Sequence, residues 1–376
     1  MRGANHRSLT ASHMPLIQLA SNENPLGPSP LAIAAARDAL ASANRYPDDN
    51  SSALRDALSH LHSVPPENIL LGNGSTELID LAARTVLSPG DLAAVSHGTF
   101  PLYAIAVRSA RAESIEIPSR DFAPDLEAMA RAVTPSTKLI YLANPNNPTG
   151  TIFSAAALAR FLDAIPKTIL VVLDEAYCDY VARCDYPRSL DLLRGGRNLL
   201  VLRTFSKIHG LAGLRIGYGL APETLVQAMN AIRMIYNTSR VAHAAALAAL
   251  GDSDHRRRSL ETNRAGQLQL CAGLASLGAI PFVPDGDMAS VSARPSAGPI
   301  RIVASSADFI FLDFGCDTRP LCADLADRGV QVRPTAWMGY PHGLRVSIGT
   351  AADNDAFLGA LAAAMAGGRS ARPAKF

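Results

Sequence analysis

The sequence predicts an α/β protein: a three-layer, mostly parallel sheet with flanking helices, followed by a smaller α+β domain. Between residues 69 and 220, short and almost continuously apolar runs recur, and stretches with helical spacing separate most of them. Strands that are apolar on both faces are typical of parallel sheets covered by helices, because a strand with one wet face alternates instead. After Gly278 the pattern changes to shorter strand-like runs, which indicates a second unit.

The length and composition fit such a protein. The chain has 376 residues, of which 48% are hydrophobic and 18% charged, and this length exceeds what one small core needs. The net charge of +2 gives no field for nucleic acid. No apolar run approaches the roughly 20 residues that cross a bilayer, and residues 1–13 lack the apolar core of a secretion signal. The five cysteines have no CxxC spacing, so we expect reduced thiols, a cytoplasmic protein and no metal site.

The expected elements follow in chain order. Residues 15–30 are rich in Asn and Pro, and we expect an irregular arm there. Helices are expected at 31–43, 52–62, 76–87, 101–110, 126–133 and 155–164, and through most of 224–277. Strands of the large sheet are expected at 69–71, 92–95, 114–117, 139–142, 169–173, 199–202 and 215–220. In the smaller unit we expect strands at 309–314, 330–333 and 344–348, and helices at 319–328 and 353–365.

These elements divide the chain into three parts. Residues 1–44 form an arm and a helix that we expect to pack with the small domain, residues 45–260 form the large domain, and residues 261–376 form the small domain. Residues 285–304 are expected to be a surface excursion, and the tail from residue 367 to be frayed. The Ser-His-Met run at 12–14 favours a native start at Met14 about as well as at Met1.

Polar loops rich in Gly and Pro directly follow several predicted strands. The Gly-Asn-Gly-Ser-Thr-Glu run at 72–77 opens a helix, where Ser75 can act as the cap and the first N–H groups favour a phosphate. The Asn-Pro-Asn-Asn-Pro-Thr-Gly run at 144–150 presents amides, and Asp174 ends a buried strand, where a carboxylate needs a partner. Each loop alone also fits an ordinary turn or ion pair. Ligands of such sheets bind at the carboxyl ends of the strands, where all these loops lie.

One further loop carries a lysine. Lys207 follows a predicted strand, between the hydroxyls of Thr204 and Ser206 and a glycine-rich turn that leads to Arg215. An amine at a strand end suits Schiff-base chemistry with a carbonyl, and hydroxyls with a guanidinium suit a phosphate. Together these groups indicate pyridoxal phosphate (PLP), an aldehyde that carries a phosphate. A Ser-Lys pair by itself more often means a surface lysine, so the other loops decide the interpretation.

Taken together, the motifs resemble those of fold-type I PLP-dependent aminotransferases of class I/II, and within them the histidinol-phosphate aminotransferase group. The resemblance spans residues from about 20 to about 350 and is more specific for fold and cofactor than for substrate. The matching segments are residues 21–25, 45–47, 72–75, 99–100, 144–150, 174–177, 203–207, 210–215 and 344–350.

The resemblance implies a role for each candidate site residue. Lys207 would bind the cofactor aldehyde and then move the substrate proton, and Asp174 would pair with the ring nitrogen. The other implied cofactor contacts are Asn147 and Tyr177 at the ring oxygen, Phe100 on the ring face, and Gly74, Ser75, Thr76, Thr204, Ser206 and Arg215 around the phosphate. Tyr46 of a neighbouring subunit would also reach this phosphate, which implies a homodimer with shared active sites.

Three residues are implied for the substrate. Arg345 would take its carboxylate, Arg333 would take a distal anionic group, and Asn24 in the arm would complete the site. Either arginine could instead be a strand arginine paired with a surface acid. Trp337 precedes Arg345 and fits the pocket wall or ordinary packing equally well.

The resemblance implies transfer of an amino group from a small-molecule donor to a 2-oxo acid such as 2-oxoglutarate. Histidinol phosphate is the best single donor candidate, and an aromatic or unusual basic amino acid of a biosynthetic pathway is nearly as good. A PLP-dependent lyase or decarboxylase on the same scaffold is the alternative. A non-catalytic regulator is disfavoured because Lys207 is intact and no DNA-binding segment is appended.

The sequence departs from the group in three places. Residues 285–304 separate two segments that usually lie close together, Asp308 stands where the group usually has Asn, and Leu26 stands where some relatives have Tyr. These departures concern the choice of donor and not the cofactor contacts.

Overall fold

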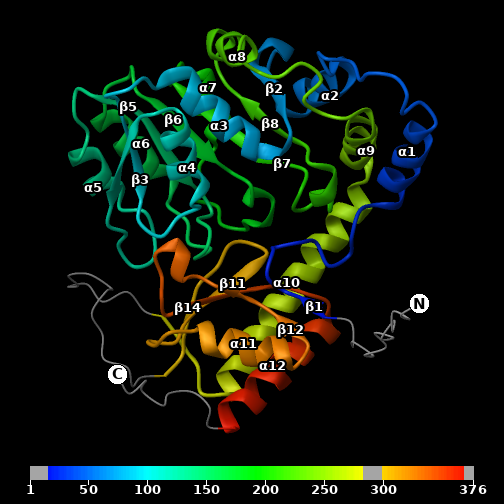
Figure 1. Ribbon diagram of the computed structural model, residues 1–376, viewed down its shortest axis with the longest axis vertical. Helices are drawn as coiled ribbons and strands as arrows, with labels where there is room; N and C mark the ends of the chain where they lie inside the picture. Colours follow the sequence, from blue (N-terminus) through cyan, green and yellow to red (C-terminus); the bar gives the residue numbers. More distant parts are fainter. Residues whose placement is uncertain (1–15, 283–298, 368–376) are drawn as a thin grey trace, which may run out of the picture.

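The structure is a computed structural model that describes residues 16–282 and 299–367. The expectations for residues 1–13, for most of the segment 285–304 and for the tail beyond 367 lie outside the described residues. Figure 1 shows a larger α/β unit at the top and a smaller unit below it. The long helix α10 (Ser253–Ser276) runs from one unit to the other.

The larger unit is built on a seven-stranded sheet with the order β2-β8-β7-β6-β5-β3-β4. Its strands are β2 (Ile69–Gly72), β3 (Leu92–Ser96), β4 (Glu113–Ile117), β5 (Thr137–Ala143), β6 (Leu170–Asp174), β7 (Leu199–Thr204) and β8 (Gly217–Leu220). Only β8 runs against its neighbours β2 and β7, so the predicted mostly parallel sheet is confirmed. The last strand starts later than the predicted residue 215 because Arg215 has a left-handed φ of 54°.

Helices cover both faces of this sheet, which explains the continuous apolar runs. Leu170 and Val172 of β6 point into one hydrophobic core, and Val171 and Leu173 point into the other. The first core is closed by α3 (Gly74–Val86), α4 (Leu102–Ser109) and α8 (Glu223–Asn230). The second is closed by α2 (Ser52–His62), α5 (Leu126–Arg131), α6 (Ala155–Ala164), α7 (Ser189–Arg194) and α9 (Arg240–Gly251).

The N-terminal helix α1 (Pro30–Leu40) corrects one prediction. It was expected to pack with the small domain, but it packs against α9 of the large unit. The facing residues are alanines, among them Ala32 of α1 and Ala242 and Ala245 of α9, and such small side chains let two helices approach closely. Only the arm before α1 joins the small unit, where the short strand β1 (Ile17–Gln18) pairs with β12 (Val330–Gln331). The Asn- and Pro-rich composition did not predict that strand.

The smaller unit is a five-stranded sheet with the order β13-β14-β11-β10-β9. Its strands are β9 (Ile280–Pro281), β10 (Arg301–Val303), β11 (Phe309–Asp313), β13 (Arg333–Pro334) and β14 (Gly343–Ser347), and α10, α11 (Arg319–Asp327) and α12 (Ala351–Ala366) close its core. The strand β10 lies within the segment predicted as a surface excursion, and its pairing with β11 contradicts that prediction for residues 301–303. The domain boundary predicted at residue 260 falls inside α10, a continuous helix.

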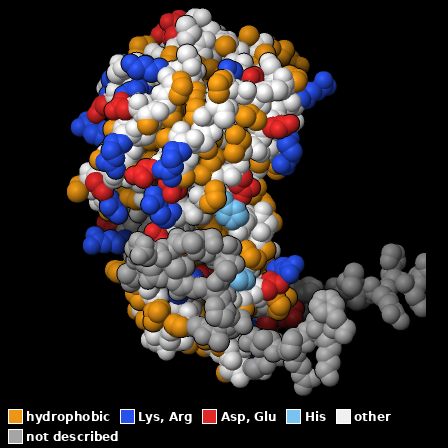
Figure 2. All heavy atoms as spheres, turned by 90° about the vertical axis from the view of Figure 1, so that its left-hand side faces the viewer, with side chains coloured by type: hydrophobic (Ala, Val, Ile, Leu, Met, Phe, Trp, Pro, Cys, Tyr) orange, Lys and Arg blue, Asp and Glu red, His pale blue; other side chains and the backbone are white. Residues whose placement is uncertain are grey.

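On the face in Figure 2, acidic and basic side chains are intermixed, in keeping with the net charge of +2. In the described ranges, no helix is long and apolar enough to cross a membrane, and no cluster of His, Cys, Asp and Glu is placed to hold a metal ion. The five cysteines, all within those ranges, are free thiols.

Candidate active site

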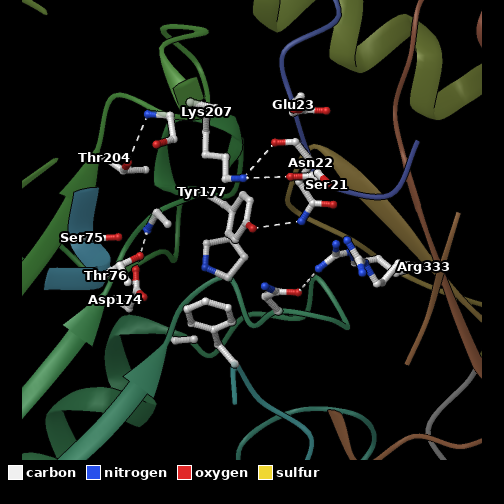
Figure 3. A pocket seen from close by; sticks show the side chains of 18 of the residues that line it. Ser21, Asn22, Glu23, Ser75, Thr76, Asp174, Tyr177, Thr204, Lys207 and Arg333 are labelled. Atoms are coloured by element: carbon white, nitrogen blue, oxygen red, sulfur yellow. Dashed lines mark hydrogen bonds between the residues drawn. The ribbon is translucent and has the colours of Figure 1, made fainter. Parts of the chain in front are cut away.

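A cavity of about 380 Å³ lies where the carboxyl edge of the large sheet meets the arm and the small unit (Figure 3). It collects most of the predicted site residues. Its lining comprises Ser21, Asn22, Glu23, Ser75, Thr76, Phe100, Tyr103, Ala143, Pro145, Asn147, Asp174, Ala176, Tyr177, Thr204, Ser206, Lys207, Ala212, Arg215, Arg333, Trp337, Met338 and Arg345. Segments from both units therefore build one site.

Lys207 enters this cavity from the loop after β7. Its Nζ donates hydrogen bonds to the backbone carbonyls of Asn22, at 2.9 Å, and Ser21, at 3.2 Å. It also lies 5.4 Å from the ring centroid of Tyr177. No carboxylate of the described chain lies within ion-pair distance of this amine. An amine that is held only by hydrogen bonds to backbone carbonyls can leave them and react with an aldehyde or ketone.

Asp174 lies at the end of β6 and is 6% exposed. Tyr103 of α4 donates a hydrogen bond of 2.8 Å to its Oδ2, and the Ala176 N–H donates one of 3.1 Å to its Oδ1. Burial raises the pKa of Asp174 to about 6, although both hydrogen bonds act to lower it. A buried carboxylate of this kind is stabilised by a cationic partner, and a protonated ring nitrogen is one. The sequence analysis missed Tyr103, whose signal was a lone hydroxyl in an apolar helix.

The backbone at the start of α3 forms a cradle beside Arg215. Gly74 has a φ of 71°, and a Cβ added there would lie 2.2 Å from Nη2 of Arg215. Arg215 in turn contacts the hydroxyls of Ser206, at 3.4 Å, and Thr76, at 3.5 Å. The helix begins at Gly74 with Asn73 as its N-cap and no side-chain cap hydrogen bond, so Ser75 is not the cap that we predicted. A guanidinium, hydroxyls and the N–H groups of a helix start together fit a phosphate.

Arg345 and Arg333 form a cationic wall of the cavity. Arg345 on β14 is 5% exposed, and its two Nη atoms donate to Asn147 Oδ1 and to the carbonyl of Ala20. Arg333 on β13 donates from Nε to the same carbonyl, at 3.1 Å. Burial lowers the pKa of Arg345. Among the described residues neither arginine has an acid within ion-pair distance, so both can bind an anionic ligand.

Three predicted residues do not line the cavity: Gly74, which lies behind Arg215, and Asn24 and Tyr46. Asn24 uses its amide to fix the arm, because Nδ2 donates to the Ile208 carbonyl and to Ser259 Oγ, both at 2.9 Å. Contrary to the prediction, Asn24 does not face the substrate region; Asn22 lines the cavity instead, and its Nδ2 donates to the Tyr177 hydroxyl at 2.9 Å. Tyr46 is 76% exposed and stacks on Tyr236 at 4.6 Å, so its role toward a neighbouring subunit stays a prediction.

The donor groups fit PLP as a set. The cavity contains an amine without an acidic partner for an aldehyde and a buried carboxylate for a ring nitrogen, and the cradle for a phosphate lies beside it. The cradle supports this fit independently of the amine, since a side chain at Gly74 would fill it. Phe100 and Tyr177 line the same cavity, and their rings would pack against a flat cofactor ring.

Comparison with known proteins assigns the class. Residues 14–361 match the model of the family "Aminotransferase class I and II", and the chain belongs to this family. Membership confirms the predicted fold-type I architecture, the transaminase class and PLP as the cofactor.

Relatives of high similarity point to a group within the family. The chain is 43% identical to the histidinol-phosphate aminotransferase of Moorella thermoacetica, over 92% of this chain and 84% of that protein. It is 42% identical to histidinol-phosphate aminotransferase 2 of Pseudomonas fluorescens, over 96% of this chain and 92% of that protein. Among solved structures, histidinol-phosphate aminotransferase from Sinorhizobium meliloti in complex with pyridoxal-5'-phosphate matches with a TM-score of 0.81 and 29% identity, over 94% of this chain and 91% of that one.

Proposed function

We propose that this chain transfers the amino group of histidinol phosphate to a 2-oxo acid such as 2-oxoglutarate, with PLP as cofactor. The observation that carries the proposal is the similarity just described: relatives named as histidinol-phosphate aminotransferases match at 42–43% identity over more than nine tenths of this chain. The two arginines of the cavity support it, because the proposed donor and acceptor both carry anionic groups.

Each residue of the site has a separate role in the proposed reaction. Bound PLP supplies an electron sink for the charge that remains when the substrate carbon loses its proton. Lys207 holds the cofactor through its amine and, once released, carries that proton. Asp174 keeps the ring nitrogen protonated, and the Gly74 cradle with Arg215 holds the phosphate. Arg345 and Arg333 orient the substrate through its anionic groups.

We also propose that the working enzyme is a homodimer in which Tyr46 completes the partner's site. Tyr46 and Tyr236 stack on each other next to Met234 and Ile235, which are 74% and 70% exposed. Contiguous exposed apolar side chains mark interaction surfaces. Sedimentation of the purified protein is expected to give a dimer. Tyr46→Phe is expected to weaken cofactor binding without dissociating that dimer, and a monomer with full activity would contradict the proposal.

A donor panel tests the function directly. The purified protein with PLP should be yellow, and its absorbance should change on addition of histidinol phosphate. Turnover with histidinol phosphate is expected to exceed turnover with aromatic or basic amino acids. Release of carbon dioxide without an oxo product would favour the lyase or decarboxylase chemistry instead.

Replacement of the lysine provides the matched control. Lys207→Ala is expected to lower turnover by at least about 1,000-fold, because both the covalent anchor and the proton carrier are lost. Lys167→Ala removes an exposed lysine in the loop before β6 and should leave turnover unchanged. Equal activity of the two variants would contradict the assigned role of Lys207.

A further inference from the structure

Asp308 is a buried carboxyl group that the catalytic roles above do not use. It immediately precedes β11, is 2% exposed, and does not line the cavity. Neither of its carboxylate oxygens has a hydrogen-bond partner among the described residues. An unpaired buried carboxylate is costly, so such a group in a folded protein needs an explanation.

The surroundings of Asp308 belong to the active site. Its backbone carbonyl accepts a hydrogen bond of 2.9 Å from the N–H of Ile348. Ile348 directly follows β14, the strand that carries Arg345. The next residue, Phe309, packs edge-on against the Tyr177 ring at 5.2 Å and lies 5.4 Å from the Arg345 guanidinium. Nε of Arg345 is buried and also lacks a partner among the described residues. The acid and the substrate arginine are thus both left incompletely satisfied.

The charged and titratable groups that act on Asp308 come from three elements. They are Lys207 after β7, Arg345 on β14 and the Tyr180 hydroxyl after β6. From α10, Asn263 donates a hydrogen bond of 3.3 Å to the neighbouring Ala307 carbonyl and contributes no charge. Burial raises the pKa of Asp308 to about 7, and the two cations act against that rise. The carboxyl group can therefore change its charge near neutral pH.

In the proposed reaction, Arg345 meets two ligands of different charge. It requires one site to bind a 2-oxo acid, whose carboxylate neutralises Arg345, and then histidinol phosphate, which carries a neutral hydroxymethyl group in place of that carboxylate. With the second ligand a buried guanidinium is left without a counter-charge, which is costly. A nearby acid that is charged with one ligand and neutral with the other removes this cost.

We propose that Asp308 is a positioning residue that balances Arg345: it is ionised when Arg345 faces no anion and takes up a proton when a substrate carboxylate binds there. The inference rests on the proposed function, because it explains how one arginine accepts a carboxylate from the acceptor and a hydroxymethyl group from the donor. It makes acceptor binding and protonation of Asp308 linked equilibria, so each favours the other.

Proton uptake by the wild-type holoenzyme is the first test. Maleate, an unreactive dicarboxylate, is titrated calorimetrically at pH 7 in buffers with different ionisation enthalpies. The expected result is an uptake of about a third of a proton for each maleate bound. Maleate affinity should fall about fivefold as the pH rises from 6 to 8.5, because the ionised acid competes for Arg345. Binding with no uptake and no pH dependence would overturn the proposal.

The variant Asp308→Asn separates this role from a structural one. Loss of the charge should tighten maleate binding at pH 8 and raise the KM of histidinol phosphate about fivefold at unchanged kcat. Proton uptake should fall toward zero, and any remainder belongs to other groups such as the cofactor. Asp327→Asn, at an exposed position of α11, should match wild type in every measurement.

The direction of the two changes decides between the explanations. A merely structural Asp308 would make both ligands bind more weakly in the Asn variant, and that outcome overturns the proposal. Opposite changes for maleate and histidinol phosphate support it. If wild type turns over a different donor but not histidinol phosphate, the proposed function fails, while maleate-linked proton uptake still tests the charge balance between Asp308 and Arg345.

Discussion

Tyr103 donates a hydrogen bond of 2.8 Å to Asp174, and its ring stacks on Tyr141 at 4.8 Å. The contact joins α4 to two central strands of the large sheet, because Asp174 ends β6 and Tyr141 lies in β5. Phe100 meets the same ring edge-on at 5.7 Å. A stack of aromatic rings therefore holds the carboxylate that the cofactor ring nitrogen requires.

Removal of the hydrogen bond from Tyr103 to Asp174 should change how cofactor binding depends on pH. The pKa of Asp174 is about 6 without cofactor, so its carboxylate is present above that pH and lost below it. Cofactor uptake should accordingly weaken as the pH falls through about 6. Tyr103→Phe removes a contact that lowers this pKa, so the midpoint should move upward and PLP should bind about tenfold more weakly at pH 7.

The measurement is the PLP absorbance in a titration of the apoprotein from pH 5 to 8. Tyr141→Phe is the matched control, because that hydroxyl donates to the Ile79 carbonyl, at 2.7 Å, and not to Asp174. The control should keep the wild-type midpoint. An identical midpoint in Tyr103→Phe would show that the hydrogen bond does not tune Asp174.

The phosphate cradle should tolerate no side chain. Gly74→Ala places a methyl group against Arg215 at a left-handed backbone position, so the guanidinium must move out of the cradle. We expect PLP affinity to fall at least about tenfold, and we expect the free energy of unfolding of the apoprotein to fall by about 1–2 kcal/mol, because Ala is strained at a left-handed φ. Gly213 lies in the short 3-10 helix η3 (Ala212–Leu214) that leads to Arg215. In Gly213→Ala the new Cβ has open space and no left-handed φ, and affinity should be retained. Equal losses in both variants would mean that the loop, not the cradle, was disturbed.

The sequence predicted the cofactor side of the site far better than the substrate side. Asp174, Lys207 and the turn at Gly74 each follow a strand whose neighbours were predictable, so their meeting at one sheet edge followed from parallel topology. Asn22 and Asn24 lie in one arm without periodicity. Their partners, Tyr177 and Ser347 for the first and Ile208 and Ser259 for the second, are distant in the chain. Nothing local distinguishes the two asparagines.

The dependence on partners that are distant in the chain also explains why the sequence analysis misplaced α1 and missed Tyr103. The alanine face of α1 matches α9, but composition does not say which of several apolar surfaces an Ala-rich helix will meet. Tyr103 occupies a core-facing position of α4, where a tyrosine normally contributes its ring. Its hydroxyl gains a function only because β6 ends at Asp174 opposite it.

A buried ion pair beneath the site should matter for stability. Glu175, whose side chain is fully buried, pairs with Arg203 of β7 at 2.9 Å and joins the strand ends that carry Asp174 and Lys207. Arg203→Met leaves an uncompensated buried acid and should lower the free energy of unfolding by about 3–5 kcal/mol. The double variant Arg203→Met with Glu175→Gln should recover more than half of that loss, because no charge remains buried. Urea denaturation measures both, and a double variant less stable than the single one would contradict the argument.

Trp337 should report ligand binding by its fluorescence. It is the single tryptophan of the chain, lines the cavity together with Met338 and Arg333, and is 59% exposed. Bound PLP absorbs where an indole emits, so loading the apoprotein should quench the emission by energy transfer, and maleate should shift the remaining emission by removing water from the ring. Trp337→Phe should lose both signals and still turn yellow with PLP. If maleate does not shift the emission that remains in the wild-type holoenzyme, the indole points away from the cavity in solution, and packing, not the pocket wall, explains Trp337.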